Sequence, residues 1–263
     1  NEDSTVVENR VLTTAEIQNA AATFEGLDMG VPYIAQIFYN EVLRGTLNTK
    51  TSGSSGSLIF NINIPGITAE DISTALAGHA AEGTKKVTVN FASGMEFNME
   101  GTITIPTGIQ DISFVGSENA NGKLSQLNKV YFAIESEVND VNFEYLSMNS
   151  DGGFMFQVGA QKFHDITFEG CEVKQVNSAV RLHSGAEGNS VNFNNCWVSN
   201  TGGWSFLNVG SGCTIPAINV TNSTLTEFNT RIADIRVKTD IKFKNVTLVN
   251  IAEKMTHLWL LDN

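Results

Sequence analysis

The spacing of hydrophobic residues divides the chain into two parts. Over residues 11–44 they recur every three or four positions, and Thr13 with Glu16 forms a capping box at the start of this stretch. The spacing predicts two helices, the second of them over residues 31–43. From residue 58 onward, hydrophobic residues alternate with polar ones instead, and this period predicts β-strands.

One eight-residue pattern then recurs about every 25 residues, with apolar or small side chains at its first, third, sixth and eighth positions. The five clearest copies begin at Val141, Ile166, Val191, Ile218 and Ile241. A unit this small cannot bury its own apolar face, but a stack of units buries a continuous core. Three short strands in each unit predict an all-β fold, a right-handed parallel β-helix of about seven coils.

The same patterns predict the domain organisation. An N-terminal helical segment covers residues 1–47, and a flexible linker rich in Ser, Thr and Gly covers residues 48–57. The β-helix domain covers residues 58–263 and opens with a capping helix over 69–82, for which Thr68 is the N-cap. Its last strand is followed by no cap, so we expect a further C-terminal segment, or another domain or chain, to cover the last coil.

Residues at equivalent positions of successive repeats stack on one another. Asn195, Asn222 and Asn245 share a corner position, where Asn tolerates left-handed backbone and its side chain can bond to the next coil, so we expect a structural Asn ladder. Cys171 and Cys196 share an inward position one repeat apart. A disulfide and a pair of free buried thiols both fit this position.

Four sequence motifs follow one another at the N-terminal end of the repeat region. They are a helix over Ile72–Ala81, Val87-Thr-Val-Asn-Phe91, Gly101-Thr-Ile-Thr-Ile105 and Ile112-Ser-Phe-Val-Gly116. With these motifs, residues 68–261 resemble the pectate-lyase-like β-helix superfamily. The Phe-x-x-Cys coils are most similar to secreted β-helix domains of glycan-degrading gut bacteria. The resemblance implies the fold, but not the activity, because this fold hosts lyases, hydrolases, binding proteins and adhesins.

The composition limits which classes of partner the protein can bind, and the start of the chain suggests where the protein is located. Lys and Arg number 16 against 28 Asp and Glu, a net charge of −12, which argues against a nucleic-acid partner. No run approaches the roughly 18 apolar residues of a membrane span. The polar, acidic start of the chain is typical of the segment after the lipidated Cys of bacterial surface lipoproteins. We therefore expect an extracellular or cell-surface protein, lipid-anchored or not, with the periplasm as the alternative.

Strand alternation points a set of polar and aromatic side chains outward from one sheet. Since coils stack about 4.8 Å apart, we expect them to form one column. Aromatic rings stack on sugar rings, and amide and guanidinium groups bind hydroxyls or carboxylates. The predicted binding residues are Tyr131, Gln157, Arg181, His183, Asn208, Asp234, Arg236, His257 and Trp259. The same alternation points Met155 and Phe206 outward, and an ordinary solvated sheet face fits this composition too.

The sequence therefore predicts a protein that binds an extracellular polysaccharide without catalysis and without a cofactor. The first alternative is a lyase or hydrolase acting on a uronate-containing glycan. The resemblance implies that a lyase would need Ca²⁺ held by clustered acids, and no such cluster stands beside Arg181 or Arg236 in the sequence. The second alternative is an adhesin or structural solenoid without glycan affinity. No Cys or His pair has zinc spacing, so no metal site is predicted.

Overall fold

The computed structural model describes residues 6, 8–19, 22, 24, 32–50, 57–251 and 259–261. The chain divides into two compact units, Asn1–Ser55 and Gly56–Asn263. The division falls within the segment predicted as a linker, residues 48–57. Of that segment, residues 48–50 belong to a strand and residues 51–56 lie outside the described residues.

The N-terminal unit begins with a short helix, α1 (Thr14–Asn19). The predicted capping box is present. Thr13 Oγ1 accepts the Glu16 N–H at 3.2 Å, and Glu16 Oε2 accepts the Thr13 N–H at 2.8 Å. The first predicted helix is therefore confirmed at its start, although it spans less than two turns.

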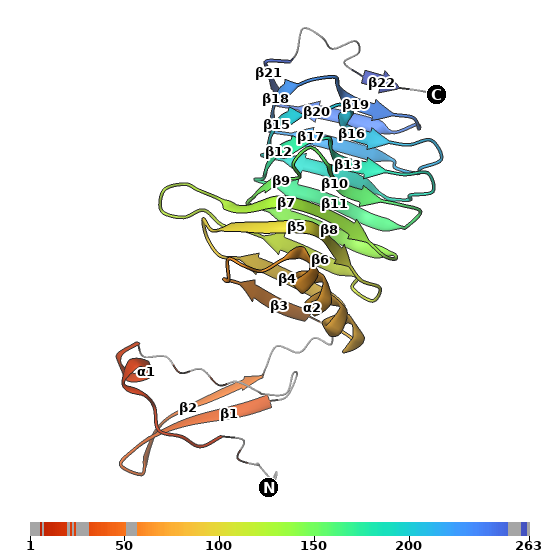
Figure 1. The fold of residues 1–263 in the computed structure, drawn as a ribbon. Helices are drawn as coiled ribbons and strands as arrows, with labels where there is room; N and C mark the ends of the chain where they lie inside the picture. The colour runs from red at the N-terminus through yellow and green to blue at the C-terminus, as the bar shows by residue number, and fades with distance from the viewer. Residues whose placement is uncertain are drawn as a thin grey trace. The chain divides into compact units, whose positions relative to one another are not determined.

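The second predicted helix, over residues 31–43, is wrong. This stretch forms an antiparallel hairpin of β1 (Pro32–Tyr39) and β2 (Val42–Lys50), shown in Figure 1. Asn40 and Glu41 join the strands with φ values of 49° and 65°, and two left-handed residues give the turn whose twist matches a hairpin. Its β-branched and aromatic side chains favour strands, and this preference overrides the helix-like spacing.

The second unit is a parallel β-solenoid of about eight turns, which confirms the predicted fold class. Each turn contributes one strand to an eight-stranded parallel sheet, the first sheet (Figure 1). Its strands in order are β3 (Ser57–Ile62), β4 (Lys86–Phe91), β6 (Asp111–Val115), β8 (Val138–Glu144), β11 (Phe163–Glu169), β14 (Ser190–Asn194), β17 (Ala217–Thr221) and β20 (Asp240–Lys244).

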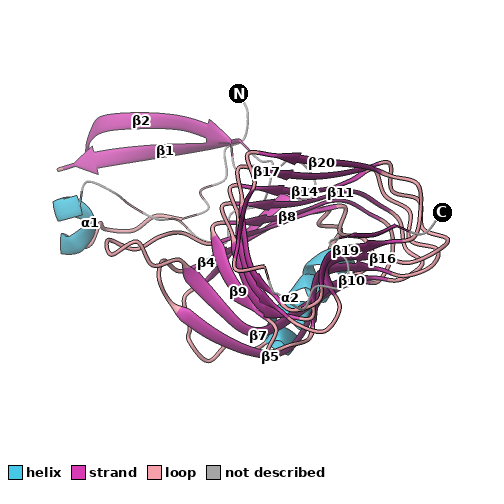
Figure 2. Ribbon diagram, turned by 90° about the horizontal axis from the view of Figure 1, so that it is seen from above, coloured by secondary structure: helices cyan, strands magenta, loops and turns pink. Residues whose placement is uncertain are grey.

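The remaining strands form a second sheet of twelve strands, in two columns. One column holds β9 (Leu146–Asn149), β12 (Glu172–Val176), β15 (Trp197–Thr201), β18 (Thr224–Phe228) and β21 (Thr247–Val249). The other holds β10 (Phe154–Val158), β13 (Ser178–Leu182), β16 (Ser205–Val209), β19 (Arg231–Ile235) and β22 (Trp259–Leu261). Two long strands, β5 (Glu96–Ile105) and β7 (Ser125–Ile134), pair with each other, and β7 joins the columns. Figure 2 shows the strands of successive turns superposed.

The corner after each of the last five strands of the first sheet, β8 to β20, is left-handed, with φ between 51° and 61° at Tyr145, Gly170, Asn195, Asn222 and Asn245. The backbone geometry predicted there is confirmed. The side-chain ladder differs from the expected one in one member. Asn245 Nδ2 donates to Asn222 Oδ1 at 3.0 Å. Asn222 Nδ2 in turn donates to Asn194 Oδ1 at 2.9 Å, so Asn194 takes the place in the ladder that was predicted for Asn195.

A second left-handed stack separates the two columns of the second sheet, at Gln175, Asn200, Glu227 and Asn250. It was not predicted from the sequence because no single residue type recurs there.

The predicted capping helix is confirmed as α2 (Ala69–Ala81). Thr68 and Asp71 form a reciprocal capping box, and Ile72 and Leu76 are fully buried against the first turns of the core. Within the described part of the chain, no helix is long and apolar enough to cross a membrane.

A stack of phenylalanine rings runs through the core beneath the first sheet. Phe114, Phe143, Phe168 and Phe193 occupy the same register on successive strands, with ring centroids 5.4, 4.6 and 4.4 Å apart. These rings are at most 1% exposed. The two middle rings, Phe143 and Phe168, therefore each pack between the rings of the turns above and below.

The stacked cysteines are free thiols, not a disulfide. Cys171 Sγ donates to the Phe143 carbonyl at 3.3 Å, and Cys196 Sγ donates to the Phe168 carbonyl at 3.4 Å. Burial raises the pKa of Cys171 well above its usual value and that of Cys196 to about 12. The thiol forms are thus favoured by the fold itself.

Replacing a ring of this stack should destabilise the solenoid. We expect Phe168→Ala to cost about 3–5 kcal/mol, through lost burial and the cavity left behind. The control Thr167→Ala changes the neighbouring half-buried residue, which faces the opposite side of β11, and should cost about 0.5 kcal/mol or less. Urea unfolding followed by circular dichroism measures both; equal midpoints for the two variants would contradict the role of the stack.

The cysteines should resist thiol reagents in the folded protein. We expect Ellman's reagent at pH 8 to modify Cys171 and Cys196 only slowly, and all three cysteines of the chain to react after denaturation in urea. Because the folded-state pKa values are raised, the folding stability from these thiols should be lost as pH rises above the ordinary thiol value of 9.0. Recovery of a single thiol in urea without reductant would indicate a disulfide instead.

Candidate functional site

Four of the predicted binding residues lie at one level of the second sheet. Gln157 pairs with Arg181, Arg181 with Asn208, and Asn208 with Asp234, on β10, β13, β16 and β19. Parallel pairing in register therefore produces the predicted column. Its exposure is uneven, because Gln157 and Arg181 are half-buried while Asn208 and Asp234 are buried.

The other predicted residues lie beside this column or outside what is described. On β7 the residue level with Gln157 is Ala133, and Tyr131 lies two residues before it. The Tyr131 ring packs so closely on Gly153 that a Cβ atom on Gly153 would collide with the ring. His183 and Arg236 each follow directly after the last residue of their strands, β13 and β19. His257 lies outside the described residues.

Trp259 does not lie at the level of this column. It pairs with Ala233 on β19, whereas Leu260 pairs with Asp234. The prediction from alternation was therefore one position out of register.

The expectation that Met155 and Phe206 point outward is also wrong. Both are fully buried, and the Phe206 ring lies edge-on to the Phe193 ring, with centroids 4.6 Å apart. They are the second residues of β10 and β16, just after the corner between the two columns, where the chain turns and simple alternation breaks down.

The most distinctive outward group combines one cation with two aromatic rings. The Arg181 guanidinium lies 4.3 Å from the centroid of the Phe154 ring and 4.9 Å from that of Trp204. The two rings meet edge to face, with centroids 5.8 Å apart. We call Phe154, Arg181 and Trp204 the Arg181 cluster. Its members come from three successive turns, and Trp204 remains 41% exposed.

Neighbouring turns hold the Trp204 backbone in place. The Trp204 N–H donates to Asn177 Oδ1 at 3.2 Å, and Thr230 Oγ1 donates to the Trp204 carbonyl. Gly202 and Gly203 precede it, and the Gly202 N–H bonds to the Val176 carbonyl at 2.7 Å. The indole is thus presented from a fixed corner.

Polar groups at the edge of the Arg181 cluster are suited to hydrogen bonding. His183 Nε2 lies 3.3 Å from Gln157 Oε1. Burial lowers the pKa of His183, and the positive charge of Arg181 lowers it further. The neutral imidazole is therefore favoured near pH 7, and it offers one donor and one acceptor.

The carboxylate of this face is already engaged. Asp234 is 2% exposed, and it accepts bonds from Arg231 Nη1 at 3.0 Å and from Arg236 Nε at 3.1 Å. These bonds tie the buried carboxylate to two guanidinium groups and fix the position of both.

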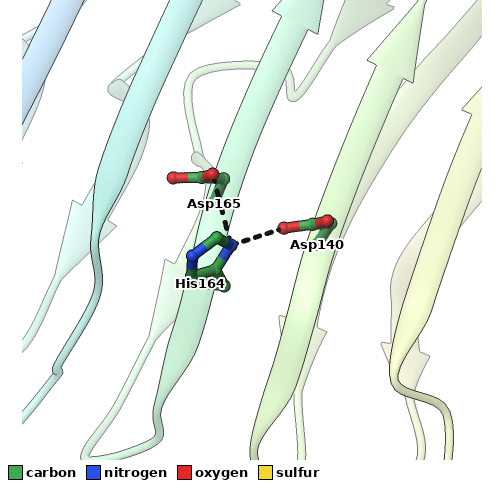
Figure 3. A group of neighbouring side chains, drawn as sticks. All are labelled: Asp140, His164 and Asp165. Carbon is green, nitrogen blue, oxygen red and sulfur yellow. Dashed lines mark hydrogen bonds and ion pairs between the residues drawn. The ribbon is translucent and has the colours of Figure 1, made fainter.

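A second group lies on the first sheet, where the sequence predicted no metal ligands. Asp140, His164 and Asp165 bring their donor atoms within 4.8 Å of one another (Figure 3). We call them the Asp–His cluster. Two of its members, Asp140 and His164, line a groove of about 720 Å³. Asp111, Glu187, Lys86 and Lys162 are among the other charged residues that line it.

Both clusters could be found only once the register was known. Asp140 and Asp165 are one repeat apart, so their stacking is in principle visible in the sequence, but nothing there shows that His164 turns toward both. The corner sequence Gly202-Gly-Trp204 was the available signal for the Arg181 cluster. Phe154 gave none, since it resembles any strand residue.

Comparison of the chain with models of protein families, with curated proteins and with solved structures finds no match. The parallel β-solenoid therefore stands on the structure itself, and the relation to pectate-lyase-like proteins stays a prediction from the sequence.

Proposed function

We propose that this protein binds an extended polysaccharide across β10, β13 and β16 and does not cleave it. The observation that carries the proposal is the Arg181 cluster, in which one guanidinium and two rings from three successive turns share one surface. Aromatic faces pack on the apolar faces of sugar rings, and the guanidinium and neighbouring amides bond to hydroxyls or carboxylates.

The shape of this surface favours a long ligand. Successive turns repeat at about 4.8 Å, so the cluster presents contacts along the axis of the solenoid. Tyr131 continues the aromatic surface toward β7, and Gln157 with His183 supplies hydrogen-bonding groups along its edge. A polymer with repeated rings and hydroxyls matches this repeated surface better than a compact ligand does.

Binding without cleavage is favoured by the state of Asp234. Glycoside hydrolysis generally needs a pair of carboxylates, one acting as acid and the other as base or nucleophile. The Asp234 carboxylate is buried and held by Arg231 and Arg236, so it is poorly placed to exchange protons with a sugar. We also propose that the protein acts outside a bacterial cell, at its surface or secreted, as the resemblance of its coils implies.

Substitutions in the Arg181 cluster should weaken polysaccharide binding. A glycan array identifies the polymer that the unaltered protein binds, and titration calorimetry gives its affinity. We expect Trp204→Ala and Arg181→Ala each to weaken binding about tenfold or more, the cost typical of a central contact residue.

The matched control is Trp197→Ala. Trp197 is 53% exposed and lies in the other column, on β15, so its loss should leave the affinity within about twofold. Absence of glycan binding by the unaltered protein would instead favour an adhesin or structural solenoid. Equal losses in all three variants would contradict a site centred on Arg181.

The lyase alternative is tested by its product. We expect no unsaturated uronate product when the protein is incubated with uronate-containing polymers, with or without Ca²⁺. A lyase of this kind would need acids that hold Ca²⁺, and the Asp234 carboxylate beside the Arg181 cluster is already bonded to Arg231 and Arg236. Ultraviolet absorbance of the unsaturated sugar measures it. Product above that of an Arg181→Ala control would overturn the non-catalytic assignment.

A further inference from the structure

The Asp–His cluster sits where two turns of the first sheet are held in register. Asp165 on β11 pairs directly with Asp140 on β8, and His164 is the preceding residue of β11. His164 Nδ1 lies 3.2 Å from Asp140 Oδ1 and 3.3 Å from Asp165 Oδ2 (Figure 3). One nitrogen and two carboxylate oxygens, the latter from adjacent turns, therefore face a common point.

The two nitrogen–oxygen separations, 3.2 and 3.3 Å, are close to those between ligands of one metal ion. Protein ligands bind Zn²⁺ at about 2.0–2.2 Å, so two of them at tetrahedral angles lie about 3.3–3.6 Å apart. The Nδ1 atom directs either its proton or its lone pair toward the same two oxygens. An ion can thus replace the proton with little movement of the side chains.

Hydrogen bonds around the cluster orient one of the carboxylates. Asp165 Oδ1 accepts from Ser190 Oγ at 2.5 Å and from Asn189 Nδ2 at 3.0 Å, which leaves Oδ2 toward the imidazole. Outer partners of this kind hold a ligating carboxylate in position and are a regular part of metal sites.

The local charge favours a cation. Asp111, Asp140 and Asp165 occupy one level on three adjacent strands, so their carboxylates are stacked at roughly the 4.8 Å strand spacing. Lys86 Nζ lies 2.9 Å from Asp111 and compensates that end of the row. At Asp140 and Asp165 a dication would relieve the repulsion between like charges.

We propose that Asp140 Oδ1, His164 Nδ1 and Asp165 Oδ2 bind one divalent transition-metal ion. The imidazole nitrogen selects for ions such as Zn²⁺ over Ca²⁺ and Mg²⁺, which prefer oxygen ligands alone. The ion links β8 to β11, and its remaining position faces the groove, where it takes water or an oxygen atom of a ligand. This site is on a different sheet from the Arg181 cluster, and the proposal does not rest on glycan binding.

Titration calorimetry of the full chain with Zn²⁺ alone, and separately with Ca²⁺, tests the proposal. We expect one Zn²⁺ per chain and weaker binding of Ca²⁺. Asp140→Asn and His164→Gln should each weaken Zn²⁺ binding at least about tenfold, and Ser190→Ala should weaken it less, since it removes only an outer partner. Asp165→Asn gives a third ligand variant, and circular dichroism verifies that each variant is folded.

The matched control is His79→Gln. His79 Nδ1 lies 3.3 Å from a single carboxylate, that of Glu82, and lacks the second converging acid, so its loss should leave the Zn²⁺ affinity unchanged. No saturable Zn²⁺ binding up to about 1 mM would overturn the site. So would folded Asp140→Asn and His164→Gln variants that bind Zn²⁺ as tightly as the unaltered protein does. Ca²⁺ binding as tight as that of Zn²⁺ would overturn the assignment to a transition-metal ion.

Discussion

Parallel pairing between successive turns, in a fixed register, is the constraint on which the rest of this structure depends. Each strand of the first sheet bonds to the equivalent strand of the next turn, as when Ile166 pairs with Val191 and Phe168 with Phe193. A repeat one turn long therefore places equivalent residues directly over one another. Inside the solenoid this gives stacked phenylalanines, and at the corners it gives stacked left-handed residues.

The same constraint builds both candidate sites. The Arg181 cluster takes one residue from each of three turns, and the Asp–His cluster spans two. Their backbones belong to strands or to corners held by hydrogen bonds between turns, such as that from Trp204 to Asn177. Side chains on so fixed a frame lose little freedom when they bind, and this favours affinity.

The two candidate sites differ in the sign of the charged side chains around them, and the net charge of −12 does not show this difference. On the second sheet, Arg231 and Arg236 bind the buried Asp234, and Arg181 lies at the same level two turns away. On the first sheet, acids are stacked on adjacent strands and lie toward the groove. One acidic chain thus carries a face with several guanidinium groups on its second sheet and a row of carboxylates on its first.

The repeat in the sequence was enough to predict the solenoid and the left-handed corner at Asn195, because a short repeat with inward apolar positions has few ways to bury its core. The capping helix was predicted separately, from its N-cap residue Thr68. The repeat also predicted that Arg181 and Gln157 share a level, since that follows from alternation and repeat length alone. Prediction failed over residues 31–43, where the spacing of apolar residues suits a helix but the β-branched and aromatic side chains and the two-residue turn favour a hairpin.

Which side chains meet is visible only in the folded chain. Alternation cannot show that Phe206 turns into the core at a corner, or that Trp259 is one residue out of register with Asp234. Nor can it show that Trp204 comes back over Arg181, or that His164 points at two carboxylates. Such contacts depend on how each corner bends and on the rotamers that packing permits, and these are properties of the assembled stack of turns.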